Sequence, residues 1–358
     1  MLTALDKAGY ALAQGARVSW FMGHYFASRR FRDAAPAEGA APRKAGQAPA
    51  LTRIFGDLGA LFARDLANAG RGLYPLPRDH DRNLLKTSRQ FFADLPVSAE
   101  RKAQSRGREV YSPELAAELP AYFLNNFHYQ TGGYLTEESA ALYDMQVEVL
   151  FSGAANAMRR QCLVPLAEAI RGRDQRKLKL LDVAAGTGRF ARFVAEAFPR
   201  LDLTVSDLSQ AYLAEAGRHI APYRASYRAA AAEALPFADN SFDFVTAIYL
   251  YHEVPPPVRR EIAREFHRVL KPGGRLVFMD SLQTGDSPDF DALLEAFPQN
   301  FHEPFYASYL SENLPSLFAG AGLRFIVKET HFLSSLHVCK KPVSAYDSRS
   351  VGAEGSPN

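Results

Sequence analysis

The amino-acid sequence predicts an α/β protein in which a helical N-terminal region precedes a mostly parallel sheet of seven strands. From Lys177 onward, short runs of β-forming residues alternate with helical stretches, as in right-handed βαβ units. The last two runs leave no room for a helix between them, so they should form an antiparallel hairpin at one edge of the sheet. Before Lys177, apolar residues recur at helical spacing.

The strands are predicted from short β-like runs in this part of the sequence. They are expected at residues 178–183, 202–206, 225–229, 242–249, 275–280, 324–330 and 334–339. The helices between them are expected at about 187–198, 209–219, 257–269 and 307–321.

Five segments divide the chain on composition and periodicity. They are an amphipathic helix at 1–32, a flexible linker rich in Ala, Pro and Gly at 33–50, a helical N-terminal region that includes a lid at 51–170, the α/β domain at 171–341, and a disordered tail at 342–358. Thr136, followed by two glutamates, is expected to cap a helix of the N-terminal region.

The chain has 358 residues, 47% of them hydrophobic, and a net charge of +3. The charge is uneven, because residues 1–32 hold five basic side chains against one acidic and residues 51–110 hold eleven against seven. Cys162 and Cys339 match no metal-binding or redox spacing, so no metal is expected. With no run of about 18 apolar residues and no signal-peptide pattern, the expected location is cytoplasmic, and no aromatic-interleaved basic tract indicates nucleic acid.

A glycine-rich turn, "LDVAAGTGRF" at 181–190, follows the first strand. Gly186 and Gly188 would let a ligand lie against backbone N–H groups at the opening of a helix. Dinucleotides and S-adenosylmethionine (SAM) both use this device, and Gly186-x-Gly188-x-x-Ala191 also fits the dinucleotide fingerprint. Asp207, at the end of the second strand, is placed to bind ribose hydroxyls or, alternatively, to cap the following helix.

Four motifs together indicate a family. "LDVAAGTGRF", "VSDLSQAYL", "AEALPFADNSFDFVTAIYLYHEVP" and "RVLKPGGRLVFMDS" occur in order between about residues 177 and 340. In this arrangement the chain resembles the class I SAM-dependent methyltransferases, most closely the ubiquinone/menaquinone- and sterol-type group. The resemblance implies a Rossmann-like methyltransferase sheet and SAM as the cofactor, and "LKPGG" before a strand argues against a dehydrogenase.

The resemblance implies roles residue by residue. The methionine part of SAM would contact Asp182, Ala184, Gly186 and Gly188, and the ribose would contact Asp207. The adenine would contact Leu208 and the loop with Glu233 and Ala234. Ile248 and Tyr249 would face the sulfonium and the substrate. The chain departs from the family at Ala184, where glycine is usual, and at Ala231, where aspartate is usual.

Catalysis by methyl transfer needs alignment above all, and a base only if the acceptor must lose a proton. "YLYHEV" offers Tyr251, His252 and Glu253 after the fourth strand, and His252 is the candidate base by its unperturbed pKa. The alternative is that His252 and Glu253 only pair or cap locally.

A lipophilic acceptor is suggested by two aromatic segments, one at 125–151 before the α/β domain and one at 282–306 after its fifth strand. His128, Tyr129 and Tyr134 are candidates for a substrate lid, with ordinary helix packing as the alternative. The sequence thus predicts methyl transfer to a small apolar or aromatic acceptor that is quinone-, sterol- or lipid-like. The alternatives are an NAD-dependent oxidoreductase and a non-catalytic SAM-binding protein. The helix at 1–32 either contacts the inner face of a membrane peripherally or packs on the protein itself.

Overall fold

The structure is a computed structural model and describes residues 2–33, 49–79 and 83–343. Most of the expected linker at 33–50 and nearly all of the expected tail at 342–358 lie outside the described residues.

The sheet has seven strands in the order β3-β2-β1-β4-β5-β7-β6. Their bounds are β1 Lys179–Val183, β2 Asp202–Asp207, β3 Ser226–Ala229, β4 Phe242–Ile248, β5 Leu270–Ser281, β6 Arg324–His331 and β7 Ser334–Lys340. The first five strands pair in parallel, whereas β7 is antiparallel to both β5 and β6. The predicted fold class, including the terminal hairpin, is therefore confirmed.

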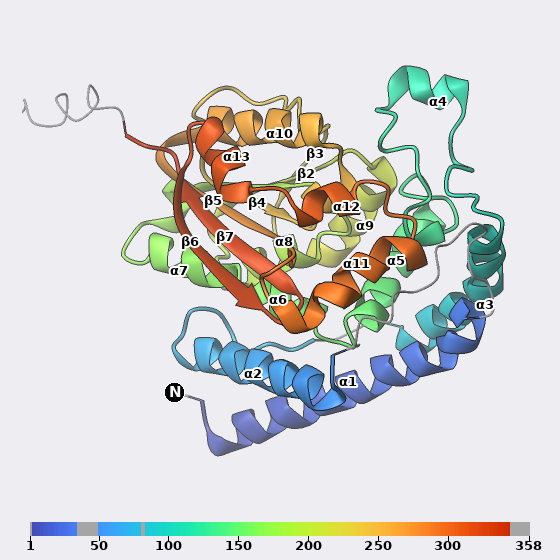
Figure 1. Ribbon diagram of the computed structural model, residues 1–358. Helices are drawn as coiled ribbons and strands as arrows, with labels where there is room; N and C mark the ends of the chain where they lie inside the picture. Colours follow the sequence, from blue (N-terminus) through green and yellow to red (C-terminus); the bar gives the residue numbers. More distant parts are fainter. Residues whose placement is uncertain (1, 34–48, 80–82, 344–358) are drawn as a thin grey trace, which may run out of the picture.

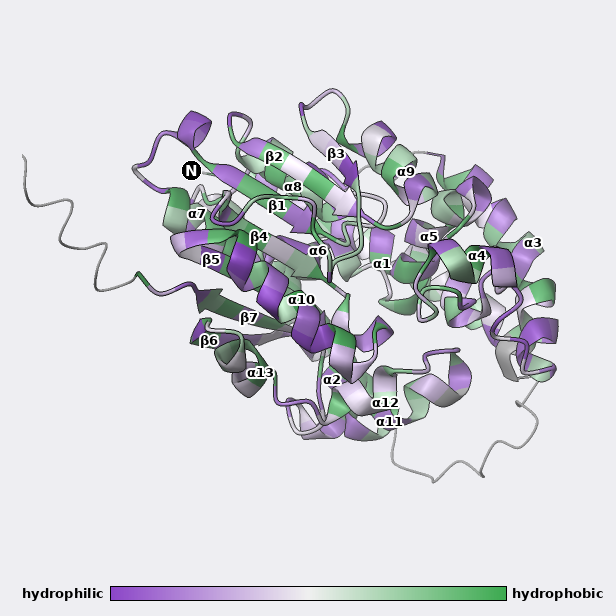
Figure 2. Cartoon of the chain, turned by 90° about the horizontal axis from the view of Figure 1, so that it is seen from above, coloured by the Kyte–Doolittle hydropathy of each residue, from purple (hydrophilic) through white to green (hydrophobic). Residues whose placement is uncertain are grey.

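Helices cover both faces of the sheet (Figure 1). On one face lie α6 Ala155–Arg160, α7 Leu163–Ile170, α8 Arg189–Ala197 and α9 Gln210–Ile220, and on the other lie α10 Pro256–Val269 and α13 Leu314–Gly320. The outward side of α10 is hydrophilic (Figure 2), while Ile262 and Phe266 of its inner side are fully buried against the sheet. The strands β1, β2, β4, β5 and β7 are consequently mostly buried, whereas the edge strands β3 and β6 are largely exposed.

Two predicted element bounds are wrong. Strand β5 begins at Leu270 rather than 275, because Leu270 already pairs with Phe242 before the register shifts. The helix expected at 307–321 is two helices, α12 Tyr306–Leu310 and α13, because Asn313 accepts a hydrogen bond from the Ser316 N–H and starts a new helix.

The N-terminal region is helical and wraps one side of the α/β domain (Figure 1). Its elements are α1 Ala4–Asp33, α2 Leu51–Gly70, α3 Leu84–Ala103, α4 Pro113–Glu118, the short 3-10 helix η1 Phe127–Tyr129, and α5 Glu137–Leu150. The Thr136 hydroxyl caps α5 by accepting from the Ser139 N–H at 3.1 Å. Two further short elements, η3 Tyr251–Glu253 and α11 Asp291–Asn300, follow β4 and β5.

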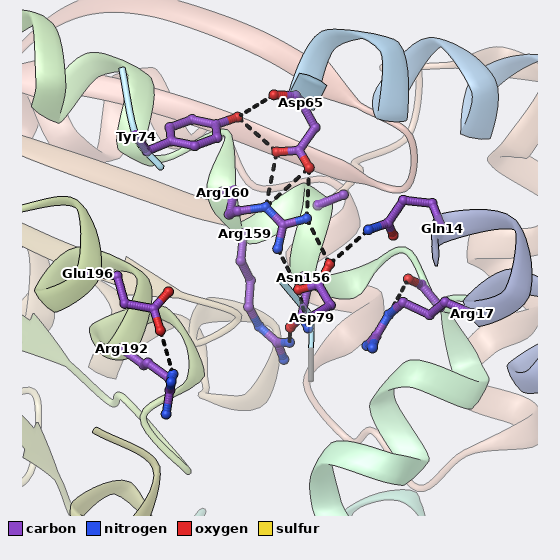
Figure 3. A network of polar contacts seen from close by, with 12 residues as sticks. Gln14, Arg17, Asp65, Tyr74, Asp79, Asn156, Arg159, Arg160, Arg192 and Glu196 are labelled. Carbon is purple, nitrogen blue, oxygen red and sulfur yellow. Dashed lines mark hydrogen bonds and ion pairs between the residues drawn. The ribbon is translucent and has the colours of Figure 1, made fainter. Parts of the chain in front are cut away.

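A buried charge network fastens α1 and α2 to this domain (Figure 3). The Arg160 guanidinium lies 2.7 Å from an oxygen of Asp65 and 2.7 Å from an oxygen of Asp79. The Tyr10 hydroxyl of α1 donates to Asp65 at 2.6 Å, and the Gln14 amide donates to Asp79 at 3.1 Å. Removing one partner of such a buried pair costs about 3–5 kcal/mol. Helix α1 therefore packs on the protein itself, and a peripheral membrane contact through its exposed residues stays a prediction.

Candidate functional site

A cavity of about 990 Å³, its open mouth included, lies at the carboxyl ends of β1, β2 and β4. This is where ligands bind in open parallel sheets, outside the strand ends at the switch in strand order. Residues of the N-terminal region, among them Tyr122, Phe127 and Tyr134, form part of its wall.

Asp182 lines this cavity with a carboxyl group that has one oxygen without a hydrogen-bond partner. One oxygen accepts a hydrogen bond from the Thr246 hydroxyl at 2.6 Å, whereas the buried Oδ2 has no hydrogen-bond partner. Burial raises the pKa of Asp182 to about 7. A buried acceptor with no donor is costly, so the site is built for a ligand that supplies one, such as an ammonium group.

The glycine turn places its two glycines in different surroundings. Gly186 lines the cavity with φ +55°, and a side chain there would meet no atom within 4 Å. Gly188 does not line the cavity. It packs closely on α9 instead, where a Cβ at this position would lie 2.7 Å from the Ala216 Cβ. The structure thus brings Gly186 to the ligand space and uses Gly188 for helix packing. Ala184 lines the cavity with φ +52°, a conformation that favours the glycine usual in the family.

Asp207 ends β2 beside the same turn. Its carboxylate accepts from the Gly186 and Ser209 N–H groups, both at 2.8 Å, so it holds the turn. The cap of α9 is Ser209 instead, whose hydroxyl accepts from the Tyr212 N–H at 3.1 Å. Burial nevertheless raises the pKa of Asp207 to about 6. Each oxygen keeps one lone pair for a further donor. Leu208 lines the cavity next to it.

The loop after β3 meets the cavity through residues other than those predicted. Ala230 and Ala232 line the cavity, while Glu233 and Ala234 do not. The Glu233 carboxylate instead accepts a hydrogen bond from the Tyr122 hydroxyl at 2.6 Å and so ties this loop to the N-terminal region.

Ile248 and Tyr249, at the end of β4, both line the cavity as expected. The Tyr249 hydroxyl is hydrogen-bonded to the Ser334 hydroxyl at 2.6 Å, so its ring is held in place, and burial raises its pKa. Its role toward a ligand stays a prediction.

Helix α5 clamps the glycine turn from outside. Asp144 accepts hydrogen bonds from the Thr187 hydroxyl at 2.8 Å and from the Arg189 guanidinium at 2.7 Å. Although burial opposes ionisation, Arg189 and His219 lower the pKa of Asp144 to about 2. The N-terminal region therefore helps to shape the cavity.

Arg159 is a cation at the cavity that the sequence did not single out. Its side chain is largely buried and lines the cavity near Asp182. Its Nη1 donates to Asn156 at the long distance of 3.4 Å and lies 4.0 Å from a Glu148 oxygen. Glu148 is closer to Arg17 of α1, at 2.7 Å. This arrangement leaves Arg159 loosely paired and suited to an anionic group of a ligand.

His252 is held by an acid from a neighbouring strand. Its Nδ1 lies 2.5 Å from Oδ1 of Asp280, near the end of β5. Although burial disfavours the charged ring, Asp280 raises the pKa of His252 to about 9, so the imidazolium form dominates at neutral pH. A group already protonated is a poor base. The expectation that His252 is the base by its unperturbed pKa is therefore not supported, and Asp280 was missed.

Glu253 is the titratable group of this motif that faces the cavity. It accepts a hydrogen bond from the Tyr134 hydroxyl at 2.6 Å, and its Oε1 lies 3.8 Å from Nε2 of His252. Burial raises the pKa of Glu253 to about 8. With a pKa of about 8 the Glu253 carboxyl is mostly protonated at neutral pH. Its ionised fraction, which grows toward pH 8, can accept a proton from an acceptor hydroxyl.

Tyr251 does not reach the cavity. It is fully buried, and its ring packs among Phe266, Phe278 and Phe318 between the sheet and the helices α10 and α13. This placement contradicts the expectation that Tyr251 takes part in catalysis.

The three residues predicted to form a substrate lid line two different cavities. Tyr134 lines the cofactor cavity, whereas His128 and Tyr129 line a second cavity beyond η1. The Nε2 atom of His128 lies 2.9 Å from a carboxylate oxygen of Glu303, a buried residue in the segment between α11 and α12. No signal in the sequence linked Glu303 to this cluster.

Comparisons with known proteins agree with the resemblance. Residues 180–274 match a family model described as a methyltransferase domain. The ubiquinone/menaquinone biosynthesis C-methyltransferase UbiE of Desulfotalea psychrophila is 34% identical over 142 residues, which cover 40% of this chain and 54% of that protein. The mitochondrial 2-methoxy-6-polyprenyl-1,4-benzoquinol methylase of Caenorhabditis elegans is 36% identical over 122 residues, covering 32% of this chain and 42% of that protein.

Among solved structures, a SAM-dependent methyltransferase from Methanosarcina mazei is 18% identical, with a TM-score of 0.40, over 49% of this chain and 98% of that one. The fold assignment rests on the strand order rather than on this score. The chain spans about half the length of the curated relatives it matches.

Residues 180–274 match a methyltransferase domain, and the sheet has the strand order of the class I SAM-dependent methyltransferase fold, which implies SAM as the cofactor. The cavity fits this molecule, because Asp182 presents an unpartnered acceptor beside the open space at Gly186. In the described ranges no group of three or more His, Cys, Asp or Glu side chains is arranged to hold a metal ion. Among the described residues, no helix is both long and apolar enough to cross a bilayer.

Proposed function

We propose that the protein transfers a methyl group from SAM to a small lipophilic acceptor with a quinol-like ring. The observation that carries the proposal is the pairing of an unsatisfied acid, Asp182, with a second acid of raised pKa, Glu253, at one cavity. The names of the relatives, which act in ubiquinone and menaquinone biosynthesis, support the acceptor class.

In this proposal each end of the cavity binds a different part of SAM. Asp182 accepts from the amino group of the methionine part, Arg159 pairs with its carboxylate, and Asp207 accepts from the ribose hydroxyls. When bound, SAM supplies a methyl group already activated on a sulfonium. The protein then contributes mainly alignment of the acceptor with that methyl group.

Glu253 would accept the proton that the acceptor hydroxyl gives up. The electron pair of that O–H bond would stay on the acceptor and form the new bond to the methyl group. The bond between sulfur and the methyl carbon would break at the same time and leave its electron pair on sulfur. His252 stays protonated against Asp280 and lowers the energy of the Glu253 carboxylate before the transfer. Tyr134 orients Glu253 through its hydroxyl.

Calorimetric titration with SAM and with NAD tests the cofactor assignment. Asp207→Ala should weaken SAM binding by tens-fold, because a hydrogen bond to a charged group contributes about 1.5–3 kcal/mol. Asp202→Ala, which changes an exposed acid at the start of the same strand, is the control and should bind normally. Unchanged affinity in Asp207→Ala, with an unchanged circular dichroism spectrum, would remove this residue from the site.

Binding and activity measurements on the same protein test the two alternative functions, an NAD-dependent oxidoreductase and a non-catalytic SAM-binding protein. The antiparallel β7 differs from the parallel six-stranded order of dinucleotide-binding sheets, and binding of NAD rather than SAM would favour an oxidoreductase. A protein that binds SAM but methylates no member of a panel of quinols, sterols and lipids would be a non-catalytic SAM-binding protein.

We also propose that the outer edge of α1 contacts a membrane surface peripherally. Leu5, Leu12 and Phe26 are 82%, 76% and 51% exposed, although Tyr10 and Phe21 of the same helix are buried in the protein. Leu5→Ser combined with Leu12→Ser should reduce co-sedimentation of the full chain with anionic vesicles at low salt. Equal sedimentation of this double variant and the unchanged protein would exclude the contact.

A further inference from the structure

A second cavity lies apart from the cofactor cavity. It occupies about 770 Å³, its open mouth included, between the last turns of α1, the length of α3, the end of α5 and the end of α11. These four helices lie on the same side of the molecule in Figure 1. The two cavities share no lining residue. Neither the matched methyltransferase domain nor the expected SAM contacts include any part of it.

The surface of this second cavity is mainly apolar. Its walls include Phe91, Leu95, Val149, Leu150 and Phe301. A cavity of this size with apolar walls is a binding site for an apolar group.

Several polar side chains of the lining are already bonded within the protein. The Ser28 hydroxyl donates to the Tyr25 carbonyl at 2.8 Å, and the Asn300 amide donates to the Ala296 carbonyl at 2.9 Å. The Ser98 hydroxyl donates to Asp94 at 2.7 Å. These groups therefore need no polar ligand, and an apolar chain can enter without leaving them unsatisfied.

The short helix η1 borders both cavities. Phe127 lines the cofactor cavity, while the next two residues, His128 and Tyr129, line the second one. His128 and Tyr129 have φ values of +54° and +55°, which are uncommon for residues with side chains and often occur at binding sites.

His128 also connects the second cavity to the catalytic acids. Its ring packs against Phe301, with the centroids 5.1 Å apart, and its Nε2 lies 2.9 Å from Glu303. The charge of Glu303 in turn contributes to the raised pKa of Glu253. Glu303 therefore pairs with His128 of the second cavity and also acts through its charge on Glu253 of the cofactor cavity.

We propose that the second cavity is the subsite for the apolar tail of the methyl acceptor. This inference rests on the proposed function and adds that the acceptor carries a long alkyl or isoprenoid chain. The head would lie at Glu253, and the tail would run beside His128 between α3 and α5. The N-terminal region then determines which acceptors bind, whereas the α/β domain supplies the cofactor site.

The test compares equilibrium binding of two probes to the full chain by calorimetry. One probe is a methylated hydroquinone bearing a decyl chain, and the other is the same ring without the chain. The decyl probe should bind at least about tenfold more tightly, because each buried methylene contributes about a factor of four in affinity. Binding is measured without turnover, so its outcome is independent of whether methylation occurs.

Variants that fill the cavity make the test specific. Val149→Trp and, on the opposite wall, Leu95→Trp should abolish the advantage of the decyl probe and leave the binding of the bare ring unchanged. Leu85→Trp, at a site of α3 that is 74% exposed, is the matched control and should keep the advantage. Using two filling variants guards against one that fails to fold.

Three outcomes would overturn the proposal. They are equal binding of the two probes, an advantage of the decyl probe that survives both filling variants, and saturable binding of free decanol with no gain for the decyl probe. The third result would mean that the cavity takes a separate lipid. Failure of SAM to bind would instead overturn the proposed function, since SAM binding is measured in its own titration.

Discussion

Replacing Asp280 with asparagine tests the electrostatic core of the site. Asp280→Asn removes a negative charge and keeps one acceptor oxygen. That oxygen can serve the Ser281 N–H and the His252 ring or the Tyr251 N–H, but not both, because these donors bond different oxygens of Asp280. The lost hydrogen bond should lower the free energy of unfolding by a similar amount at every pH, while the His252 imidazolium in addition loses the partner that stabilises it. We expect the pKa of His252 to fall from about 9 to below 6.5, because its burial then acts unopposed.

The magnitude follows from the size of the pKa change. A shift from 6.5 to about 9 corresponds to roughly 3 kcal/mol of preference for the charged ring in the folded state. Because the folded pKa is raised, this stabilisation is fully present below about pH 6.5 and is lost as the pH rises through about 9. Asp280→Asn should thus lower the free energy of unfolding by about 3 kcal/mol more at pH 6 than at pH 9.5.

Urea unfolding at the two pH values measures this difference directly. Asp289→Asn, which changes a largely exposed acid just after β5, is the control and should show little effect at either pH. A histidine-selective NMR titration, with the His252 signal identified from its loss in His252→Gln, gives the pKa itself. An equal loss of stability at both pH values, or a His252 signal that titrates near pH 6.5 in the unchanged protein, would refute the reasoning.

Three further predictions concern the glycine turn and the acid beside it. Ala184→Gly should raise the free energy of unfolding by up to about 1 kcal/mol, since alanine is strained at φ +52°, and urea unfolding will show whether it does. Gly188→Ala should lower it by about 2 kcal/mol in the same assay, because its Cβ would collide with Ala216. SAM affinity should rise between about pH 6 and pH 8 with release of a proton to the buffer, and Asp182→Asn should abolish that dependence in calorimetry.

The alternation of short β-forming runs with helical stretches was sufficient to predict the sheet, although the edge strands β3 and β6 are largely exposed. The missing helix between the last two runs was enough to predict the hairpin of β6 and β7. The two element bounds that were predicted wrongly depend on contacts with residues outside the short stretch of sequence in which a periodic pattern is detected. The early start of β5 needs Phe242 of another strand, and the break before α13 depends on a single cap at Asn313.

Site residues at the ends of strands could be predicted from the sequence. Site residues that lie in a turn, or that come from another segment of the chain, could not. Asp182, Asp207 and Tyr249 reach the cavity because parallel strands present their carboxyl ends together. In the 3-10 turn after β4, neighbouring residues point in different directions, so Tyr251 enters the core while Glu253 faces the cavity. No periodicity in a sequence encodes that division.

The assignment of the base shows how a partner from another strand changes the chemistry of a motif. Taken in isolation, the unperturbed pKa of histidine makes His252 the natural proton acceptor in "YLYHEV". The sheet places β5 beside β4, and Asp280 thereby lies against the imidazole and keeps it charged. The charge on His252 in turn opposes the burial that raises the pKa of Glu253, and holds that pKa near neutrality rather than far above it. Proton transfer at this site therefore depends on three side chains together, of which the local motif supplies two and the register of the sheet supplies the third.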